Sequence, residues 1–183
     1  MVIVQTDDLA ADRKRIDELG IRVVWQVKLS DAGGDIVLLG IAGSGAATAV
    51  KALGVNLPAT PFEVARFDGG TVIRLDDRRS QLAVRTDAAP QIWETLASSA
   101  RPVGTPAWRW LEIEAGIPHI TLPTQEEFVP QMANLELLGG VSFTKGCYPG
   151  QEVVARTKYL GKVKRRTYRA HINGDCPLPG TDL

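Results

Sequence analysis

The sequence is poor in cysteine, histidine and aromatic residues, and each scarcity excludes a class of protein. Its 183 residues include two cysteines and two histidines, and Phe, Trp and Tyr together make up 6%. So few cysteines do not suit a disulfide-rich secreted domain and favour a reducing compartment. His119 and His171 lie far apart without cysteines or carboxylates at metal-ligand spacing, so the sequence predicts no metal site and favours structural roles for both.

The sequence also lacks a long hydrophobic run. No stretch approaches the ~18 consecutive apolar residues of a membrane span. Residues 1–6 lack the basic start and long apolar stretch of a secretory signal. With 44% apolar and 23% charged residues, the composition is typical of a folded globular protein. These features predict a cytoplasmic protein without membrane contact.

A nucleotide-binding loop is a third absence. Gly43-Ser44-Gly45 follows an apolar run and precedes an alanine-rich one. A dinucleotide site needs a third glycine at a fixed offset, and a phosphate loop needs Gly-Lys-Ser/Thr, and neither follows here. We therefore expect a tight turn from a strand into a helix.

Hydrophobic periodicity and turn residues predict an α+β fold with a largely antiparallel sheet. Asp68-Gly69-Gly70 has hairpin turn chemistry between two apolar runs, and such a hairpin favours antiparallel pairing. The expected strands are 2–5, 21–29, 36–39, 64–67, 71–75 and 82–85, and the expected helices are 7–19, 46–53, 87–96 and about 105–115.

The expected organisation has three parts. Residues 1–104 form an α+β subdomain, residues 105–162 a helix, a loop and a cysteine motif, and residues 163–183 a short tail with too little apolar material for a domain. Because the chain begins inside a strand and ends at a turn, we expect it to be part of a longer protein.

Charge is balanced overall but unevenly placed. Residues 1–144 hold 13 Lys/Arg against 18 Asp/Glu, whereas residues 145–169, expected to be extended, hold eight against one. Clustered positive charge attracts anions, although a charge run alone is more often a solvated face. A cysteine and a glycine-rich turn in the same segment favour a functional role. The basic patch comprises Lys158, Lys162, Lys164 and Arg165.

Cys147 is the candidate catalytic residue. It lies in the run Lys145-Gly146-Cys147-Tyr148-Pro149-Gly150-Gln151-Glu152. The glycines allow a sharp turn or a close approach to a ligand, and the positive charge of Lys145 favours the reactive thiolate. The alternative is a buried cysteine acting as a small hydrophobe, and the glycines and charges favour the activated thiol. A Cys–His pair stays open, because such partners meet in space. Cys176 has no comparable setting.

Trp108 and Trp110 are the next candidates. Large aromatic residues lie in cores more often than they bind ligands. Two residues apart on a helix, they cannot share a face, so we expect one to point away from the core, where it could stack on a flat ligand.

The same residues carry a resemblance to a known family. The sequence resembles the YgfZ proteins, folate-binding relatives of the aminomethyltransferase (T-protein) of the glycine cleavage system. The resemblance covers Ile113 to Arg165 without an evident gap and is weaker upstream. It rests on Phe128-Val129-Pro130-Gln131, Asn134-Leu135, Gly139-Gly140-Val141-Ser142-Phe143, the run from Lys145 to Arg156, Lys158-Tyr159, Gly161 and Lys164-Arg165.

The resemblance implies a folate-dependent accessory protein for the synthesis or repair of iron–sulfur clusters. Its fold would be aminomethyltransferase-like, its cofactor tetrahydrofolate or a derivative, and its partners iron–sulfur client enzymes, including tRNA-modifying ones. Trp108 matches a folate-stacking tryptophan, and Glu114 the carboxylate that meets the pterin, whose N–H donors suit it. The motif loop around Cys147 comprises Lys145, Gly146, Tyr148, Gly150, Gln151, Glu152 and Arg156.

The sequence departs from the family in two respects. Members usually begin with roughly 100 more residues and continue into a C-terminal β-barrel, of which only a first strand near Val163 to Ala170 is expected here. Glu112 also stands where many members carry a basic residue.

Two alternative functions stay open. One is a tetrahydrofolate-dependent aminomethyltransferase, although the cysteine motif is foreign to that activity. The other is a nucleic-acid-binding module that contacts tRNA weakly through the basic residues of 156–169, with an affinity that falls steeply with salt.

Overall fold

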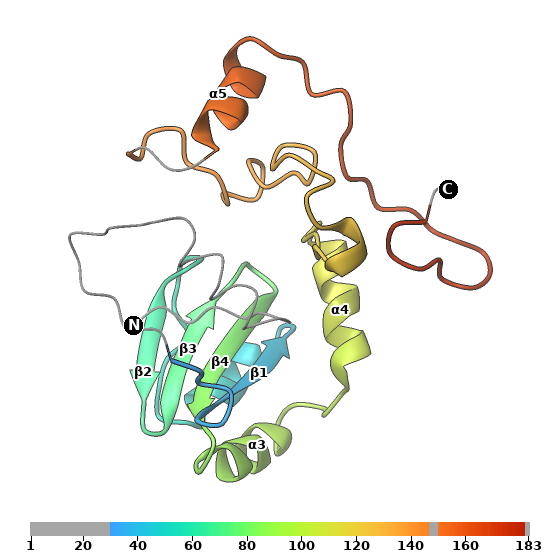
Figure 1. Cartoon of the computed structure of the whole chain (residues 1–183). Coiled ribbons are helices and arrows are strands. Elements are labelled where there is room, and N and C mark those ends of the chain that lie inside the picture. Colours follow the sequence, from blue (N-terminus) through green and yellow to red (C-terminus); the bar gives the residue numbers. More distant parts are fainter. Residues whose placement is uncertain (1–29, 147–149, 182–183) are drawn as a thin grey trace. The chain divides into compact units, whose positions relative to one another are not determined.

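The computed structural model describes residues 30–146 and 150–181, which fall into two compact units, Met1–Val103 and Gly104–Leu183. The first unit is built on a four-stranded sheet in the order β1-β4-β3-β2, in which every neighbouring pair is antiparallel (Figure 1). This confirms the α+β class and the antiparallel sheet. The strands are β1 (Ile36–Ala42), β2 (Val64–Phe67), β3 (Gly70–Arg74) and β4 (Arg79–Arg85).

The expected hairpin is the β2–β3 pair. Phe67 pairs with Gly70, so that Asp68 and Gly69 form the loop. Gly69 has φ +90°, a left-handed conformation that a side chain would strain. Gly70 lies so close to β4 that a Cβ atom would stand 2.6 Å from the carbonyl oxygen of Ala83.

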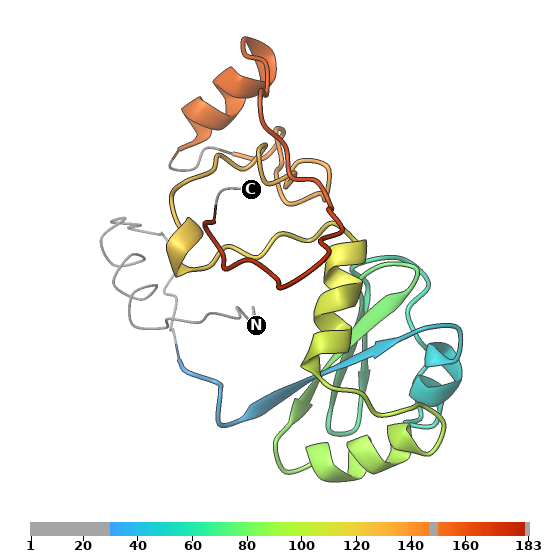
Figure 2. The ribbon, with the colours of Figure 1, turned by 90° about the vertical axis from the view of Figure 1, so that its right-hand side faces the viewer.

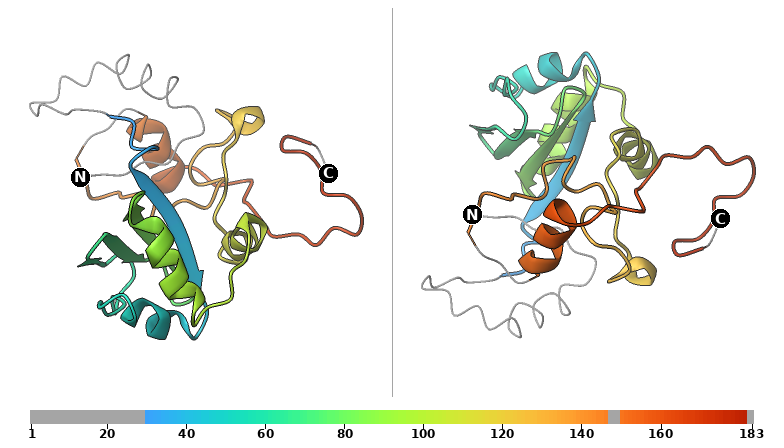
Figure 3. Two further views of the ribbon diagram at one scale, coloured as in Figure 1. Left: turned by 90° about the horizontal axis from the view of Figure 1, so that it is seen from below. Right: turned by 90° about the horizontal axis from the view of Figure 1, so that it is seen from above.

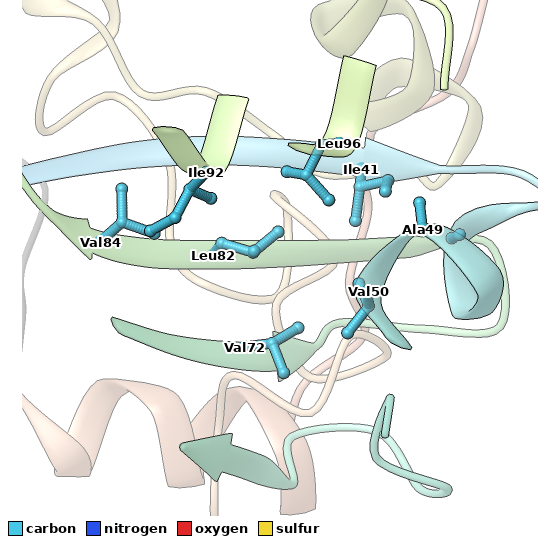
Figure 4. Close-up of a cluster of buried hydrophobic side chains, with 9 residues drawn as sticks. Ile41, Ala49, Val50, Val72, Leu82, Val84, Ile92 and Leu96 are labelled. Carbon is cyan, nitrogen blue, oxygen red and sulfur yellow. The ribbon is translucent and has the colours of Figure 1, made fainter. Parts of the chain in front are cut away.

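Two helices complete the core of the first unit. Helices α2 (Ala46–Lys51) and α3 (Ala89–Ala97) contact each other and pack on the sheet (Figure 3). Because side chains alternate along a strand, the residues paired with Leu82 share its face of the sheet. Leu82, Val72 and Val84 are fully buried, and side chains of both helices point toward them (Figure 4).

The expected turn from strand to helix is also confirmed. β1 ends at Ala42 and α2 begins at Ala46, with Gly43 in the left-handed region at φ +94°. The three residues between them therefore form a tight connection, as expected from a sequence that lacks the glycine patterns of nucleotide-binding loops.

The turn between β3 and β4 is organised by one carboxylate. The backbone N–H groups of Arg78 and Arg79 donate to Asp76 Oδ1, and Arg79 Nε donates to Oδ2, each at 2.8 Å. Burial raises the pKa of Asp76, but these hydrogen bonds and the Arg79 charge outweigh it and hold this pKa below its usual range.

The second unit has less regular structure. Its elements are α4 (Thr105–Glu114), the short 3₁₀ helix η1 (Leu122–Thr124) and α5 (Gln151–Tyr159), joined by irregular segments (Figure 2). None of the helices described in either unit has the length and apolar content needed to span a bilayer.

The basic segment differs from the expectation of an extended strand. Residues 151–159 form α5, which begins at Gly150, with φ +81°. Glu152 lies in the first turn and Arg156 and Lys158 in the last, the arrangement that the helix dipole favours. Residues 161–172 form neither helix nor strand, so the barrel strand expected at 163–170 is not shown.

Candidate functional site

Helix α4 carries the two residues to which the family resemblance assigns folate. The chain enters it extended at Gly104, with Pro106 in the first turn, where the missing N–H costs nothing. Gly116, at φ +70°, ends it: its N–H donates to the Ile113 carbonyl, and the next N–H donates to that of Glu112. This paired closure is the common glycine stop of helices. It turns the following residues back along the helix.

One carboxylate, that of Glu112, joins two other side chains of this region. Trp108 Nε1 donates to Glu112 Oε1 at 2.9 Å, as the spacing of one helical turn permits, and His119 Nε2 lies 2.8 Å from Glu112 Oε2. The Glu112 side chain is 16% exposed. Glu112, where the family resemblance leads us to expect a basic residue, is therefore an acceptor that holds the Trp108 indole and the His119 ring.

The two tryptophans of α4 face different surroundings, as expected. Trp108 is half-buried and bonded to Glu112, whereas Trp110 is 54% exposed. In this unit Trp110 is thus the more open ring, and Trp108 is the oriented one.

Glu114 does not stand open to a ligand in this structure. Its Oε1 accepts a charged hydrogen bond from Arg169 Nη1, a residue 55 positions further along the chain. The carboxylate that would receive the N–H groups of a pterin is therefore already bound to a guanidinium, which offers a similar pair of planar donors.

Gln131 is the buried junction between the loop before the motif and the helix after it. Its side chain is fully buried, and its Nε2 donates to the Val154 carbonyl of α5 at 2.7 Å. Its Oε1 is buried without a hydrogen-bond partner. An unpaired buried acceptor destabilises the folded state, so the Gln131 amide orients α5 but lowers the stability of this region through its unpaired oxygen.

The segment after α5 is fastened to the same loop. Arg166 Nη2 donates to Glu136 Oε1 at 2.6 Å, and Asn134 Nδ2 donates to the Thr167 carbonyl at 2.7 Å. The Thr167 N–H in turn donates to the Met132 carbonyl at 2.9 Å. Isolated links of this kind explain why the segment is ordered without joining a sheet.

The structure describes only the ends of the motif loop. Cys147 and Tyr148 lie outside the described residues. Before them, the Lys145 N–H donates to Ser142 Oγ at 3.2 Å, and Gly146 has open space where a side chain would be. After them, Gly150 begins α5, which carries Gln151, Glu152 and Arg156.

Next to the loop, two aromatic rings and a cation form a cluster. Phe143 and Tyr159 meet edge to face, with ring centroids 6.3 Å apart and planes at 73°. Lys158 Nζ lies 4.8 Å from the centre of the Phe143 ring, within the range of a cation–π contact. The Tyr159 ring is 69% exposed, so the cluster presents an aromatic face to solvent.

The positive segment divides into two groups of cations. Arg166 and Arg169 are neutralised by Glu136 and Glu114. Among the residues that the structure describes, no acidic side chain pairs with the exposed Lys162, Lys164 or Arg165. The basic patch therefore keeps an excess of positive charge and follows the aromatic cluster closely in the sequence, with Lys158 as part of both.

A small cavity lies within this unit. Its volume is about 260 Å³, and its lining includes His119, Phe128, Met132 and Arg165. This is slightly below the ~300–1,000 Å³ of most small-molecule sites. It can take a ring-sized group. Over residues 30–146 and 150–181, no three His, Cys, Asp or Glu side chains are grouped to hold a metal ion.

Sequence reasoning missed Glu112, His119, Gln131 and Arg169. The spacing of four between Trp108 and Glu112 was the one local signal for any of these contacts. The isolation of His119 in the sequence predicts a structural role without naming a partner, and the turn at Gly116 brings its ring to Glu112 of α4. The other contacts join residues more than 20 positions apart, and no local pattern indicates them.

Comparisons with known proteins extend over nearly the whole chain. No family model matches the chain. A tRNA-modifying protein YgfZ of Yersinia pseudotuberculosis serotype IB (strain PB1/+) is 38% identical over 172 residues, which is 92% of this chain and 52% of that protein.

Two further relatives carry the same name. The protein of Y. pseudotuberculosis serotype O:1b (strain IP 31758) is 41% identical over 152 residues, 81% of this chain and 46% of its own length. That of Y. enterocolitica serotype O:8 / biotype 1B is 37% identical over 172 residues. The chain spans about half the length of the curated relatives it matches. Over that shared half, the chain is similar to proteins named tRNA-modifying protein YgfZ.

Proposed function

We propose that this chain is part of a folate-dependent accessory protein for the synthesis or repair of iron–sulfur clusters, which supports tRNA-modifying enzymes. The similarity over 92% of the chain to proteins named tRNA-modifying protein YgfZ carries the proposal. The cofactor would be tetrahydrofolate or a derivative, and the clients iron–sulfur enzymes.

The residues of α4 fit a pterin in part. Trp108 offers an oriented, half-buried ring, because Glu112 holds its indole N–H. Glu114 offers a carboxylate already engaged by planar N–H donors, those of Arg169, and a pterin edge would have to replace them. Bound folate would supply a one-carbon carrier, and Trp108 and Glu114 would hold its pterin ring.

The thiol of Cys147 is the proposed reactive group. It lies outside the described residues, so its support comes from the motif alone. Lys145 and the basic residues that follow favour its thiolate, the form that attacks electrophiles and binds iron. The thiolate would act on a cluster, a sulfur species or a folate one-carbon unit.

Rescue in cells tests the pathway and the thiol together. In a strain lacking the protein that carries this chain, iron–sulfur enzyme activity and tRNA modification would be measured after return of the wild type, Cys147→Ala or the matched control Cys176→Ala. We expect rescue by the wild type and the control, and loss of most of it with Cys147→Ala. Full rescue by Cys147→Ala would remove the thiol from the proposal, and no rescue by the wild type would remove the pathway.

Folate binding separates the proposal from the aminomethyltransferase alternative. Titration of the same protein with tetrahydrofolate should give saturable binding that Glu114→Gln weakens about tenfold, as expected for loss of a charged hydrogen bond, whereas Trp110→Phe should leave it unchanged. Transfer of a one-carbon unit from an aminomethyl donor to tetrahydrofolate should be absent. Sustained transfer would favour the aminomethyltransferase instead.

A further inference from the structure

Helix α5 ends in a surface whose chemistry the folate proposal does not use. It consists of the Phe143–Tyr159 ring pair, Lys158 over the Phe143 ring, and the exposed cations Lys162, Lys164 and Arg165. We propose that this surface, here called the aromatic–cation surface, binds single-stranded RNA directly. An unstacked base would lie on the Tyr159 ring, and the neighbouring cations would bind phosphates.

The aromatic half of the surface is organised for stacking. Tyr159 is the last residue of α5, and its exposed ring is supported edge-on by Phe143 at 6.3 Å. A supported ring loses little freedom when a base stacks on it, and every base has a flat face to offer. A ring buried in a core could not stack on a base, but Tyr159 is 69% exposed.

The charged half is organised for phosphates. Arg166 and Arg169 are held by carboxylates of their own unit, which fixes the chain direction beyond the surface. In the described part of the chain, no carboxylate pairs with Lys162, Lys164 or Arg165, and these three lie within six residues of Tyr159. Cations combined with an exposed aromatic ring are usual in single-strand binding sites, and here the cations follow the ring within six positions of the chain.

RNA fits this combination better than an acidic protein or a lipid surface. Carboxylates or lipid headgroups would use the cations but leave the exposed aromatic face without a partner. Single-stranded RNA uses both, through its phosphates and its unstacked bases. The inference goes beyond the proposed function and does not depend on folate.

Fluorescence anisotropy of the whole chain with a labelled single-stranded RNA oligonucleotide tests the proposal. We expect binding whose logarithm falls with the logarithm of salt concentration with a slope of about −3, for four cations on a single strand. Tyr159→Ala should weaken binding about 5- to 150-fold, the range expected for loss of one stacked base. Tyr159→Phe, which keeps the ring, should restore it.

Matched controls separate stacking from charge and from misfolding. Tyr168→Ala removes a tyrosine that is more exposed than Tyr159 (84% against 69%) and is not part of the ring pair, and should change affinity less than twofold. Lys164→Ala should lower the salt slope by about 0.7. Circular dichroism should show the same helix content for every variant.

Three results would overturn the inference. One is the absence of RNA binding at low salt. Another is equal affinity of the wild type and Tyr159→Ala, which would remove the stacked base. The third is displacement of the RNA by poly-glutamate to the same extent from the wild type and from Tyr159→Ala, which would show that the surface binds any polyanion. Because none of these assays contains folate, they leave the proposed function to its own tests.

Discussion

Replacing Gln131 by methionine should leave the region around α5 about as stable as before or more stable, although it removes a hydrogen bond. The buried Gln131 amide donates to the Val154 carbonyl at 2.7 Å, while its own oxygen is buried without a partner. As a helical carbonyl, Val154 also lies in reach of the N–H four residues further on, so it is not stranded by the change.

The expected magnitude follows from these two atoms. Loss of the hydrogen bond costs about 0.5–1.5 kcal/mol, and removal of an unpaired buried acceptor returns about 1–3 kcal/mol. Methionine fills a similar volume with a flexible apolar chain. The net change for Gln131→Met therefore lies between a loss of about 0.5 kcal/mol and a gain of about 2.5 kcal/mol of stability. Gln131→Ala leaves a cavity as well and should cost about 2 kcal/mol.

Hydrogen exchange at the amides of α5 measures this change directly, because it reports the free energy of local opening. We expect protection in Gln131→Met to be close to or above that of the wild type, and protection in Gln131→Ala to fall. If Gln131→Met loses more than about 1.5 kcal/mol of protection, the amide oxygen must have a partner in solution, and the reasoning from its burial is refuted.

Two predictions concern the sheet of the first unit. Gly70→Ala should lower its stability by about 1–3 kcal/mol, because the added Cβ would overlap the Ala83 carbonyl of β4. In the control Gly34→Ala the added Cβ meets nothing within 4 Å, so its effect in urea unfolding should be below about 0.5 kcal/mol. Equal effects of the two substitutions would contradict the close approach of Gly70 to β4. Asp76→Asn should destabilise this unit at neutral pH by weakening the bonds to Arg79. Since the folded pKa of Asp76 lies below the unfolded value, its contribution is present above about pH 4 and is lost as the pH falls through the folded pKa, so a difference between wild type and variant that persists undiminished in acid would count against it.

Local pattern was sufficient for most of the described part of the first unit. The hairpin, the turn at Gly43, helices α2 and α3, and α4 of the second unit follow from apolar periodicity, glycine and proline, and each lies within a few residues of its expected place. The strands expected at 2–5 and 21–29 and the helix expected at 7–19 lie outside the described residues. Their ends differ because strand ends are set by pairing: β4 begins at Arg79, three residues before the apolar run, since the turn at Asp76 already aligns it with β3.

The second unit was less predictable because single long-range contacts order it. The basic segment was expected to be extended, but Gly150 and the placement of charges make its first part a helix. The part of the segment after α5 is fixed by hydrogen bonds to residues 131–136, which no periodic pattern in the sequence predicts. For the site, the family resemblance predicts Trp108 and Glu114, and the structure adds the side chains that hold them.

The bond between Glu114 and Arg169 gives these two parts of the chain a thermodynamic link. Any ligand that takes the Glu114 carboxylate must first displace the guanidinium, so it binds more weakly than it would to an open carboxylate and releases residue 169 as it does so. Reciprocity then requires that whatever engages Arg169 elsewhere raises the affinity at Glu114 by the same factor. Through the ion pair, ligand binding at Glu114 and release of Arg169 are therefore coupled parts of one equilibrium.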